Sequence, residues 1–487
     1  MKINALHAID FYKTGHIRQY PKDTTEIYSN FTPRHSMDGA KEVVFFGLQF
    51  FIKDFLQGYF QEFFKADVVK TLKDYTSRMD DSLGKGVVGV NHLRQLHELG
   101  YLPLKIKALP EGSLVPIGVP VLTIVNTHPD FFWLPNYLEG ALSCYLWKAI
   151  TSATKAYEYK KLLTRFAIKT GTPVDFVKYQ AHDFSFRGMS SLQDAALSGA
   201  AHLTSFHGTD SVLSLDLIEE YYSLEDGIGG SVPATEHSVM CMGGKSGELD
   251  TIRRLITEVY PTGPVSIVCD TWDFWNVVTN YLPILKNEIM ARDGKVIIRP
   301  DSGNPVKIIC GDIRAPFSTA ESKGLTQCLW ETFGGTVNEK GYKVLDGHIG
   351  MIYGDSITTV RALDILNRLD YKKFSSGNIV FGVGSFTYQY VTRDTHGFAM
   401  KATSAMIDGQ RIEIYKDPKT DCGTKKSAKG LLSVEKEDGR YVLYDEQTEC
   451  QEKSGELKVV FENGELINRT GFTEIRGRIN KTIEEKR

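Results

Sequence analysis

The chain has 487 residues, of which 42% are hydrophobic, 24% charged and 11% aromatic, and its formal net charge is −3. A chain of this length is too long to fold around one simple hydrophobic core, so two or three structural units are expected. The small net charge gives no electrostatic reason to expect binding to nucleic acid or to an anionic membrane. The seven cysteines are scattered and form no C-x-x-C pair, which is typical of free thiols in a reducing compartment. The beginning of the chain lacks the apolar core of a signal peptide, and no stretch has the length needed to span a bilayer. We therefore expect a cytoplasmic protein.

Residues 1–149 predict a region that is partly helical and partly β-rich. Aromatic side chains recur there at four-residue spacing, as at Phe51 and Phe55, which predicts a packed helix face. Two short apolar runs, at 104–108 and 121–125, predict strands of a small β unit.

Residues 150–394 alternate helical segments with short apolar runs, the pattern of a parallel α/β domain. The runs that predict strands are 176–181, 203–206, 265–268, 296–298, 349–353 and 379–381. Each of these runs is followed by polar residues at its carboxyl end. Because six strand ends do so, the active face of an α/β barrel is favoured, although an open doubly wound sheet would also collect ligands at strand ends.

Strands return in residues 395–487, where hairpin turns are expected at 437–440 and 462–465. The segment 416–430 is polar and contains five lysines. A solvated loop is the default interpretation of such a run, and a mobile loop that covers a phosphate is the alternative.

The run at 296–298 is followed by a loop that begins Arg299-Pro300-Asp301-Ser302-Gly303. An arginine can fork onto phosphate oxygens, and an aspartate can hold sugar hydroxyls or a hydrated metal ion. Serine and glycine let backbone N–H groups approach an anion. The loop therefore predicts binding of a phosphorylated sugar.

Several motifs together carry a resemblance to a known family. They are His182-Asp183-Phe184-x-x-Arg187-Gly188, Gly208-Thr209-Asp210, Glu236-His237-Ser238, Arg299-Pro300-Asp301-Ser302-Gly303, Gly354-Asp355 and Thr392-Arg393-Asp394. Their order and spacing resemble the nicotinate/nicotinamide phosphoribosyltransferase family, from Asp10-x-Tyr12-Lys13 to Lys416-Asp417-Pro418, and so over nearly the whole chain.

The resemblance implies a fold and a reaction. The fold is an atypical, incomplete α/β barrel with a flanking β-rich domain built from N-terminal and C-terminal segments. The reaction transfers the phosphoribosyl group of phosphoribosyl pyrophosphate to nicotinamide, giving nicotinamide mononucleotide and pyrophosphate in NAD salvage. Mg²⁺, ATP-coupled phosphorylation of a histidine, and a homodimer with shared active sites are implied as well.

For the base, the resemblance implies four residues. Phe184 stacks on one face of the nicotinamide ring and Tyr12 of the partner subunit on the other, and Arg299 lies near the base. Asp210 accepts a hydrogen bond from the carboxamide, and its charge would repel the carboxylate of nicotinate. Taken singly, each aromatic could be a core residue and Asp210 a helix cap.

The expected catalytic residues are His237, Asp301, Asp270 and Glu236. By resemblance His237 takes a phosphoryl group from ATP and Glu236 orients it, whereas an isolated histidine is more often a buried, hydrogen-bonded one. The resemblance also implies that Mg²⁺ is bound mainly through the diphosphate, near Asp270 and Asp301.

The resemblance also implies groups that bind the ribose, the 5′-phosphate and the diphosphate. They are Arg187, Arg299, Asp301, Gly354, Asp355, Gly384, Ser385 and Arg393, with Arg34, Lys401, Lys416 and Lys425 of the partner subunit. The chain reads Gly384-Ser385-Phe386 where some members of the family have three glycines, and Ser385 can still donate a hydrogen bond.

The residues of the sequence are also compatible with three other functions. The first is transfer to nicotinate, which Asp210 opposes. The second is a barrel isomerase or aldolase acting on a sugar phosphate, which would want a lysine or a clear acid/base residue at a strand end. The third is a nucleotide sensor without catalysis.

Overall fold

The structure is a computed structural model that describes residues 3–223, 227–416 and 428–485. It contains two compact units. The first unit comprises Met1–Thr154, Leu217–Glu225 and Val391–Arg487, and the second comprises Lys155–Asp216 and Asp226–Tyr390. Within the described ranges, no helix is both long enough and apolar enough to cross a membrane.

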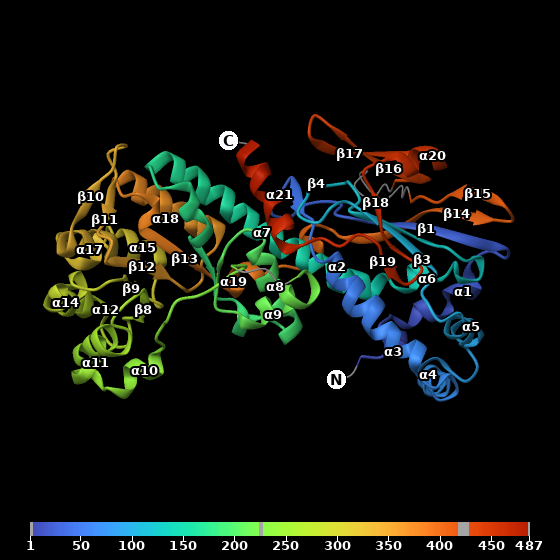
Figure 1. The fold of residues 1–487 in the computed structure, drawn as a ribbon, viewed down its shortest axis with the longest axis horizontal. Helices are drawn as coiled ribbons and strands as arrows, with labels where there is room; N and C mark the ends of the chain where they lie inside the picture. Colours follow the sequence, from blue (N-terminus) through green and yellow to red (C-terminus); the bar gives the residue numbers. More distant parts are fainter. Residues whose placement is uncertain (1–2, 224–226, 417–427, 486–487) are drawn as a thin grey trace. The chain divides into compact units, whose positions relative to one another are not determined.

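The first unit is built on a seven-stranded antiparallel sheet with the order β15-β14-β1-β5-β3-β18-β19. Its strands are β1 (Thr24–Thr32), β3 (Leu104–Ala108), β5 (Leu122–Asn126), β14 (Ala399–Ile407), β15 (Gln410–Glu413), β18 (Lys458–Glu462) and β19 (Glu465–Leu466). The N-terminal strand β1 (blue) pairs directly with β14 (orange), far along the chain (Figure 1). This sheet confirms the expected β-rich domain made from both ends of the chain.

Smaller hairpins and helices complete the first unit. The hairpins are β2 (Glu42–Val44) with β4 (Leu114–Pro116), and β16 (Leu431–Glu437) with β17 (Arg440–Gln447). The main helices are α3 (Phe60–Lys65), α4 (Val68–Leu83), α5 (Asn91–Leu99), α20 (Glu449–Ser454) and α21 (Phe472–Glu485). The predicted packed helix face is present in the π-helical segment Phe51–Tyr59, where the rings of Phe51 and Phe55 are buried and stack at 5.6 Å. Both predicted turns, at 437–440 and 462–465, are confirmed.

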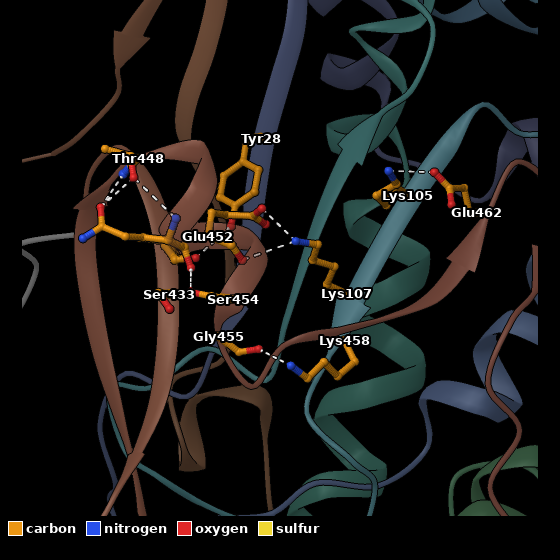
Figure 2. Close-up of polar contacts among 12 residues, drawn as sticks. Tyr28, Lys105, Lys107, Ser433, Thr448, Glu452, Ser454, Gly455, Lys458 and Glu462 are labelled. Carbon is orange, nitrogen blue, oxygen red and sulfur yellow. Dashed lines mark hydrogen bonds and ion pairs between the residues drawn. The ribbon is translucent and has the colours of Figure 1, made fainter.

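A buried ion pair joins the large sheet to α20. Lys107 on β3 places its Nζ 2.7 Å from Oε2 of Glu452 and 3.3 Å from the Glu452 backbone oxygen (Figure 2). Both side chains are only 11% exposed. Its neighbour Lys105 forms an outer pair with Glu462 at 2.7 Å, with both side chains about one-third exposed. Because a charge that loses its partner in a buried place is costly, the Lys107 pair ties α20 to the sheet.

The second unit is built on a six-stranded parallel sheet with the order β7-β6-β13-β12-β9-β8. Its strands are β6 (Ala181–Asp183), β7 (Gly208–Thr209), β8 (Val265–Val268), β9 (Val296–Arg299), β12 (Ile349–Tyr353) and β13 (Ile379–Val383). The last four confirm predicted strands. Helices surround them: α8 (Leu192–Leu203), α10 (His237–Met242), α11 (Glu248–Arg254), α15 (Pro305–Cys310), α17 (Leu325–Phe333), α18 (Thr359–Tyr371) and α19 (Ser385–Tyr388).

Two predicted strands are wrong. The run at 176–181 is mostly a 3₁₀ helix, Val174–Tyr179, and only Ala181 begins a strand. The run at 203–206 ends helix α8, where the Thr204 hydroxyl donates to the backbone oxygen of Ala201. Short apolar runs occur equally in buried helix ends and in strands, so periodicity could not separate them.

The parallel sheet closes through an irregular segment, residues 230–235. At one end Gly230 bridges to Gly208 on β7, and at the other Ala234 bridges to Ser266 on β8. The hydrogen bonds include Thr209 N to the Gly230 oxygen at 3.0 Å and Thr235 N to the Ser266 oxygen at 2.9 Å. Because one segment without regular strand structure links both edges, the barrel is incomplete, as the sequence predicts.

The strands alternate between the two sides of this barrel. Val265 and Ile267 on β8, like Ile349 and Met351 on β12, belong to the apolar core of the unit. The residues between them point to the opposite face because strand side chains alternate. That inner face includes the polar Ser266 and surrounds a cavity, so the interior is neither wholly apolar nor filled.

Candidate functional site

The barrel interior of the second unit contains a cavity of about 460 Å³. Residues from all six strands line it, Gly208 of β7 among them. These include His182 of β6, Ser266 of β8, Ile297 of β9, Gly350 of β12 and Val380 of β13. Phe184, Asp210, Ser231 and Arg299 lie at strand ends and on the closing segment. A cavity of this size with a few polar groups on an apolar wall suits a small aromatic ligand with one polar substituent.

Phe184 follows β6 and lies along the wall of this cavity. Its backbone N–H donates to the Val383 oxygen at 2.9 Å, which fixes the residue beside β13. Two glycines make room for the ring: a Cβ on Gly382 would overlap it, and one on Gly354 would lie 2.9 Å from its Cε2. The predicted stacking residue Phe184 therefore packs against the backbone of two glycines. No single sequence motif indicated this contact.

Asp210 follows β7 and takes part in a three-residue hydrogen-bond cluster. Its Oδ1 lies 2.8 Å from Nε2 of His182 and accepts from the Ser231 hydroxyl at 2.5 Å. Burial raises the pKa of Asp210, but the hydrogen bond and charge of His182, together with the hydrogen bond from Ser231 and the charge of Arg299, lower it by more. The pKa of this carboxyl is therefore below its usual value. The group is thus an anion at neutral pH, and it is a possible acceptor for a ligand N–H.

Two further polar groups on the cavity wall lack hydrogen-bond partners within the described residues. Ser266 is 4% exposed, and its hydroxyl is unpaired. Arg299 donates from Nη2 to the Thr235 oxygen at 2.5 Å, but its Nε is buried and unpaired. Because unpaired buried polar groups are costly, both donors are suited to a ligand acceptor. Sequence reasoning missed Ser266, although a lone serine in an apolar strand was a usable signal.

Asp270 and Asp301 meet at the carboxyl ends of β8 and β9. The backbone N–H of Asp301 donates to Oδ2 of Asp270 at 3.0 Å. The other oxygen of Asp270 is buried and has no hydrogen-bond partner in the described chain. Tyr353 holds the loop after β9 by donating to the backbone oxygens of Ser302 and Gly303 at 2.9 and 3.0 Å. The predicted sugar-phosphate loop is therefore braced on β12.

His237 lies beside this carboxylate pair, at the start of α10. Its Nε2 is 3.7 Å from Oδ1 of Asp270, and its Nδ1 is 3.1 Å from Oγ1 of Thr271. The imidazole is 48% exposed, so an incoming phosphate could reach it. Glu236 accepts from the Ser238 hydroxyl, and the contacts of the His237 ring come from Asp270 and Thr271. Thr271 was missed because it sits in a loop without a motif.

The remaining predicted residues of the second unit lie at neighbouring strand ends. Gly354 and Asp355 follow β12, and Ser385 begins the short helix α19 directly after Gly384. Gly188, next to the exposed Arg187, permits a close approach, because a Cβ there would lie 2.6 Å from the Ser385 Cβ. The loops after β6 and β13 are therefore in contact.

The other predicted residues belong to the first unit. Burial lowers the pKa of Lys401. The charges of four other groups also act on this pKa, so the five form one charged cluster: Glu139, Arg34, Lys416 and Lys13 with Lys401. The exposed Tyr12 is near this cluster, because Glu139 and, with opposite sign, Arg393 both act on its pKa, which burial raises. The predicted site residues thus fall into two groups, one in each unit.

Not every predicted residue can be placed. Lys425 lies outside the described residues, and so does most of the lysine-containing segment 416–430. Around Asp270 and Asp301, the described residues include no group of three or more histidine, cysteine or acidic side chains arranged for a metal ion. Mg²⁺ commonly binds through one or two carboxylates together with substrate phosphates, so this pair still fits it.

Sequence comparisons agree with this geometry. Residues 179–465 match the nicotinate phosphoribosyltransferase family, and residues 4–106 match the N-terminal domain of nicotinamide phosphoribosyltransferase. A nicotinamide phosphoribosyltransferase of Acinetobacter baylyi is 54% identical over 99% of this chain and 98% of its own length. One from Xanthomonas campestris is 34% identical over 97% of each chain, and one from Mycoplasma pneumoniae is 37% identical over 87% of this chain and 94% of its own. The chain belongs to the nicotinate phosphoribosyltransferase family, in which it is an enzyme of the phosphoribosyltransferase class.

Solved structures share the fold. A nicotinate-nucleotide pyrophosphorylase from Pyrococcus furiosus aligns with a TM-score of 0.61 at 16% identity, over 99% of this chain and 95% of its own. Human nicotinic acid phosphoribosyltransferase aligns with a TM-score of 0.56 at 14% identity, over 97% of this chain and 93% of its own. At such identities the likeness concerns the fold alone, and the residues of the cavity must indicate the substrate.

Proposed function

We propose that this enzyme transfers the 5-phosphoribosyl group from phosphoribosyl pyrophosphate to nicotinamide, producing nicotinamide mononucleotide and pyrophosphate for NAD salvage. The observation that carries the proposal is the ionised Asp210 on the wall of the cavity that Phe184 also lines. An anionic acceptor favours a neutral carboxamide, which can donate an N–H, over the carboxylate of nicotinate. The names of the similar bacterial enzymes support the same substrate.

The chemistry requires little from the protein except position and charge. The ring nitrogen of nicotinamide has a free lone pair, so it attacks the sugar carbon without a general base. The bond to the diphosphate oxygen breaks, and the diphosphate leaves with the electron pair. Phe184 would hold the ring plane, and its π face attracts the pyridinium that forms. Asp210 on one side, with the Ser266 hydroxyl and the Nε–H of Arg299 as donors, would fix the carboxamide.

Asp270 and Asp301 are the groups proposed for the ribose hydroxyls and for Mg²⁺. The buried Oδ1 of Asp270, which has no hydrogen-bond partner among the described residues, supports this role because a cation or a hydroxyl would satisfy it. A bound Mg²⁺ would neutralise charge on the departing diphosphate. Arg187, Asp355, Gly384 and Ser385 would hold the phosphate and sugar at the neighbouring strand ends.

His237 is proposed to accept a phosphoryl group from ATP. A neutral imidazole nitrogen is a competent nucleophile near physiological pH, and this ring is half exposed. The hydrogen bond from Thr271 to Nδ1, if the hydroxyl donates, would leave Nε2 protonated, whereas a threonine that accepts would leave Nε2 free to attack. The second arrangement is the reactive one.

A homodimer with shared active sites is proposed as the assembly. The charged cluster of the first unit then serves the site of the other subunit, with Lys401, Lys416 and Arg34 near the diphosphate. Tyr12 and Arg393 lie near the same cluster. The cytoplasm is the proposed location, since the described cysteines are free thiols, as a reducing compartment keeps them.

Mass detection of the products tests the function. Purified protein is incubated with phosphoribosyl pyrophosphate, Mg²⁺ and either nicotinamide or nicotinate, with and without ATP. We expect nicotinamide mononucleotide and pyrophosphate in equal amounts, more of both with ATP, and much slower reaction of nicotinate. Faster turnover of nicotinate would contradict the proposal.

A further inference from the structure

Asp183, the last residue of β6, is a buried carboxylate behind the wall of the cavity in the second unit. Its neighbour His182 lines the cavity, and successive strand side chains alternate, so Asp183 points to the opposite face of the sheet. Gly199 of α8 makes room for it there, because a Cβ on Gly199 would lie 2.8 Å from Oδ2 of Asp183. Asp183 is 1% exposed and does not line the cavity, so it acts on a ligand only through its neighbours.

One oxygen of Asp183 holds the loop that follows β6. Its Oδ1 accepts from the backbone N–H of Ser185 at 3.0 Å and from the Ser185 hydroxyl at 2.7 Å. An aspartate that accepts from the backbone two residues further on closes a tight turn. Phe184 is the middle residue of this turn, and its own N–H donates to the Val383 oxygen at 2.9 Å. The backbone that carries the Phe184 ring is therefore held at both ends of the turn.

The rest of Asp183 holds the end of β7. Its Oδ2 accepts from the Thr209 hydroxyl at 3.1 Å, and the same hydroxyl accepts from the backbone N–H of Ser211 at 3.0 Å. Its backbone oxygen accepts from the N–H of Asp210 at 3.0 Å. Asp210 thus lies between two residues that Asp183 anchors, one directly and one through the Thr209 hydroxyl.

A single rigid group therefore joins the two loops that carry Phe184 and Asp210. Hydrogen bonds to a carboxylate are stronger than those between neutral groups, and in a buried place water does not replace them. Movement of the Ser185 loop relative to Thr209 would stretch at least one of the bonds to Asp183. The carboxylate thus fixes the position of one loop relative to the other.

We propose that Asp183 is a positioning residue for the base, which sets the placement of the Phe184 ring relative to the Asp210 carboxylate. Nicotinamide is a rigid, planar molecule, so its ring face and its carboxamide N–H can meet both residues in only one relative placement. The inference rests on the proposed function, because that function assigns the ring to Phe184 and the carboxamide to Asp210. Misplacement of such contacts by about 1 Å can cost about 100-fold in rate.

The first test changes only the Thr209 side of this arrangement. Thr209→Val keeps the shape of the side chain and removes its hydroxyl. It should lower kcat/KM for nicotinamide by about tenfold and raise KM for nicotinamide, while KM for phosphoribosyl pyrophosphate stays unchanged. Thr326→Val on α17 is the matched control, because the Thr326 hydroxyl is also buried, at 2% exposure against 3% for Thr209, and donates to the Ile309 oxygen at 3.0 Å. It should leave both KM values unchanged.

The second test asks whether Thr209 acts through Asp183. Calorimetry gives the Kd of nicotinamide for the full-length wild type, Asp183→Ala, Thr209→Val and the double variant. Asp183→Ala should weaken binding by about 10- to 100-fold. The double variant should lose clearly less than the product of the two single losses, because the Thr209 hydroxyl has no carboxylate to hold once Asp183 is gone. Asp183→Asn, which keeps the volume but cannot accept on both side-chain atoms, takes the place of Asp183→Ala if the latter does not fold.

Each outcome decides the inference. Equal losses for nicotinamide and phosphoribosyl pyrophosphate in Thr209→Val would show a merely structural role and overturn it, and so would fully independent effects in the double variant. Normal turnover of nicotinamide by the wild type, with unchanged binding in the variants, would overturn the inference and leave the proposed function standing. The predicted losses of binding in a protein that does not turn nicotinamide over would support the inference and refute the proposed function. A wild type that does not bind nicotinamide would refute both.

Discussion

Replacement of Asp210 by asparagine tests the central claim about substrate choice. Asparagine has nearly the same shape and can still accept from Ser231 and His182, so the change removes one charge and little else. In the wild-type protein, Oδ1 of Asp210 lies 2.5 Å from the Ser231 hydroxyl and 2.8 Å from Nε2 of His182. Asp210→Ser removes the charge together with the acceptor.

The magnitude follows from the position of the carboxylate. Two like charges about 4 Å apart interact by about 4 kcal/mol at the effective dielectric constant of a protein surface. The Asp210 side chain is 43% exposed, so solvent screens part of this repulsion. We expect about 1.4–2.8 kcal/mol, which corresponds to about a 10- to 100-fold shift of preference toward nicotinate.

The assay compares kcat/KM for nicotinamide and for nicotinate at one fixed pH near neutrality. Asp346→Asn, at an aspartate that pairs with His348 outside the cavity, is the matched control and should leave the preference unchanged. If Asp210→Asn keeps the wild-type preference, the charge of Asp210 does not select the base. Asp210→Ser is expected to relax the preference as well, with weaker binding of nicotinamide.

Three further changes probe other parts of the chain. His237→Ala should abolish stimulation by ATP while slow basal transfer persists, and stimulation that survives would refute phosphorylation at this residue. Lys107→Met should lower the free energy of unfolding by about 3 kcal/mol, because Glu452 is left buried without a partner, and adding Glu452→Leu should restore most of it, as thermal unfolding would show. Burial, and then the charge of Asp273, raise the pKa of Glu248 to about 7, so the folded state holds this proton more tightly than the unfolded state. The free energy of unfolding should therefore fall by up to about 3 kcal/mol as pH rises from about 4.5 to about 7, and then level off. Glu248→Gln should remove this dependence on pH. If the dependence is unchanged in the variant, Glu248 is not its source.

Local sequence patterns predicted much of the second unit. The strand Val265–Val268 has apolar, β-branched residues bounded by polar ones, and so has Val296–Arg299. Such segments favour buried parallel strands because β-branched side chains suit a pleated surface between two layers. Polar residues just beyond their carboxyl ends then necessarily meet at one edge of the sheet, as Asp270 and Asp301 do.

Sequence patterns failed to predict secondary structure where the same types of residue occur both in strands and in other elements. The run at 203–206 contains the end of helix α8, and its threonine forms a helix-end hydrogen bond in place of a strand ladder. The closing segment 230–235 has no strand periodicity at all. It pairs with β7 and β8 only because both edges are held apart at the correct distance by the rest of the sheet.

The sequence by itself determined the parallel strands, the loops at their carboxyl ends and, through the spacing of its motifs, the family. Only the tertiary structure decided which side chains share a proton, a charge or a cavity. His182, Asp210 and Ser231 come from three separate segments, and Ser266 faces them because β8 alternates its side chains. Distances between such residues depend on how the barrel closes, and no local spacing contains that information.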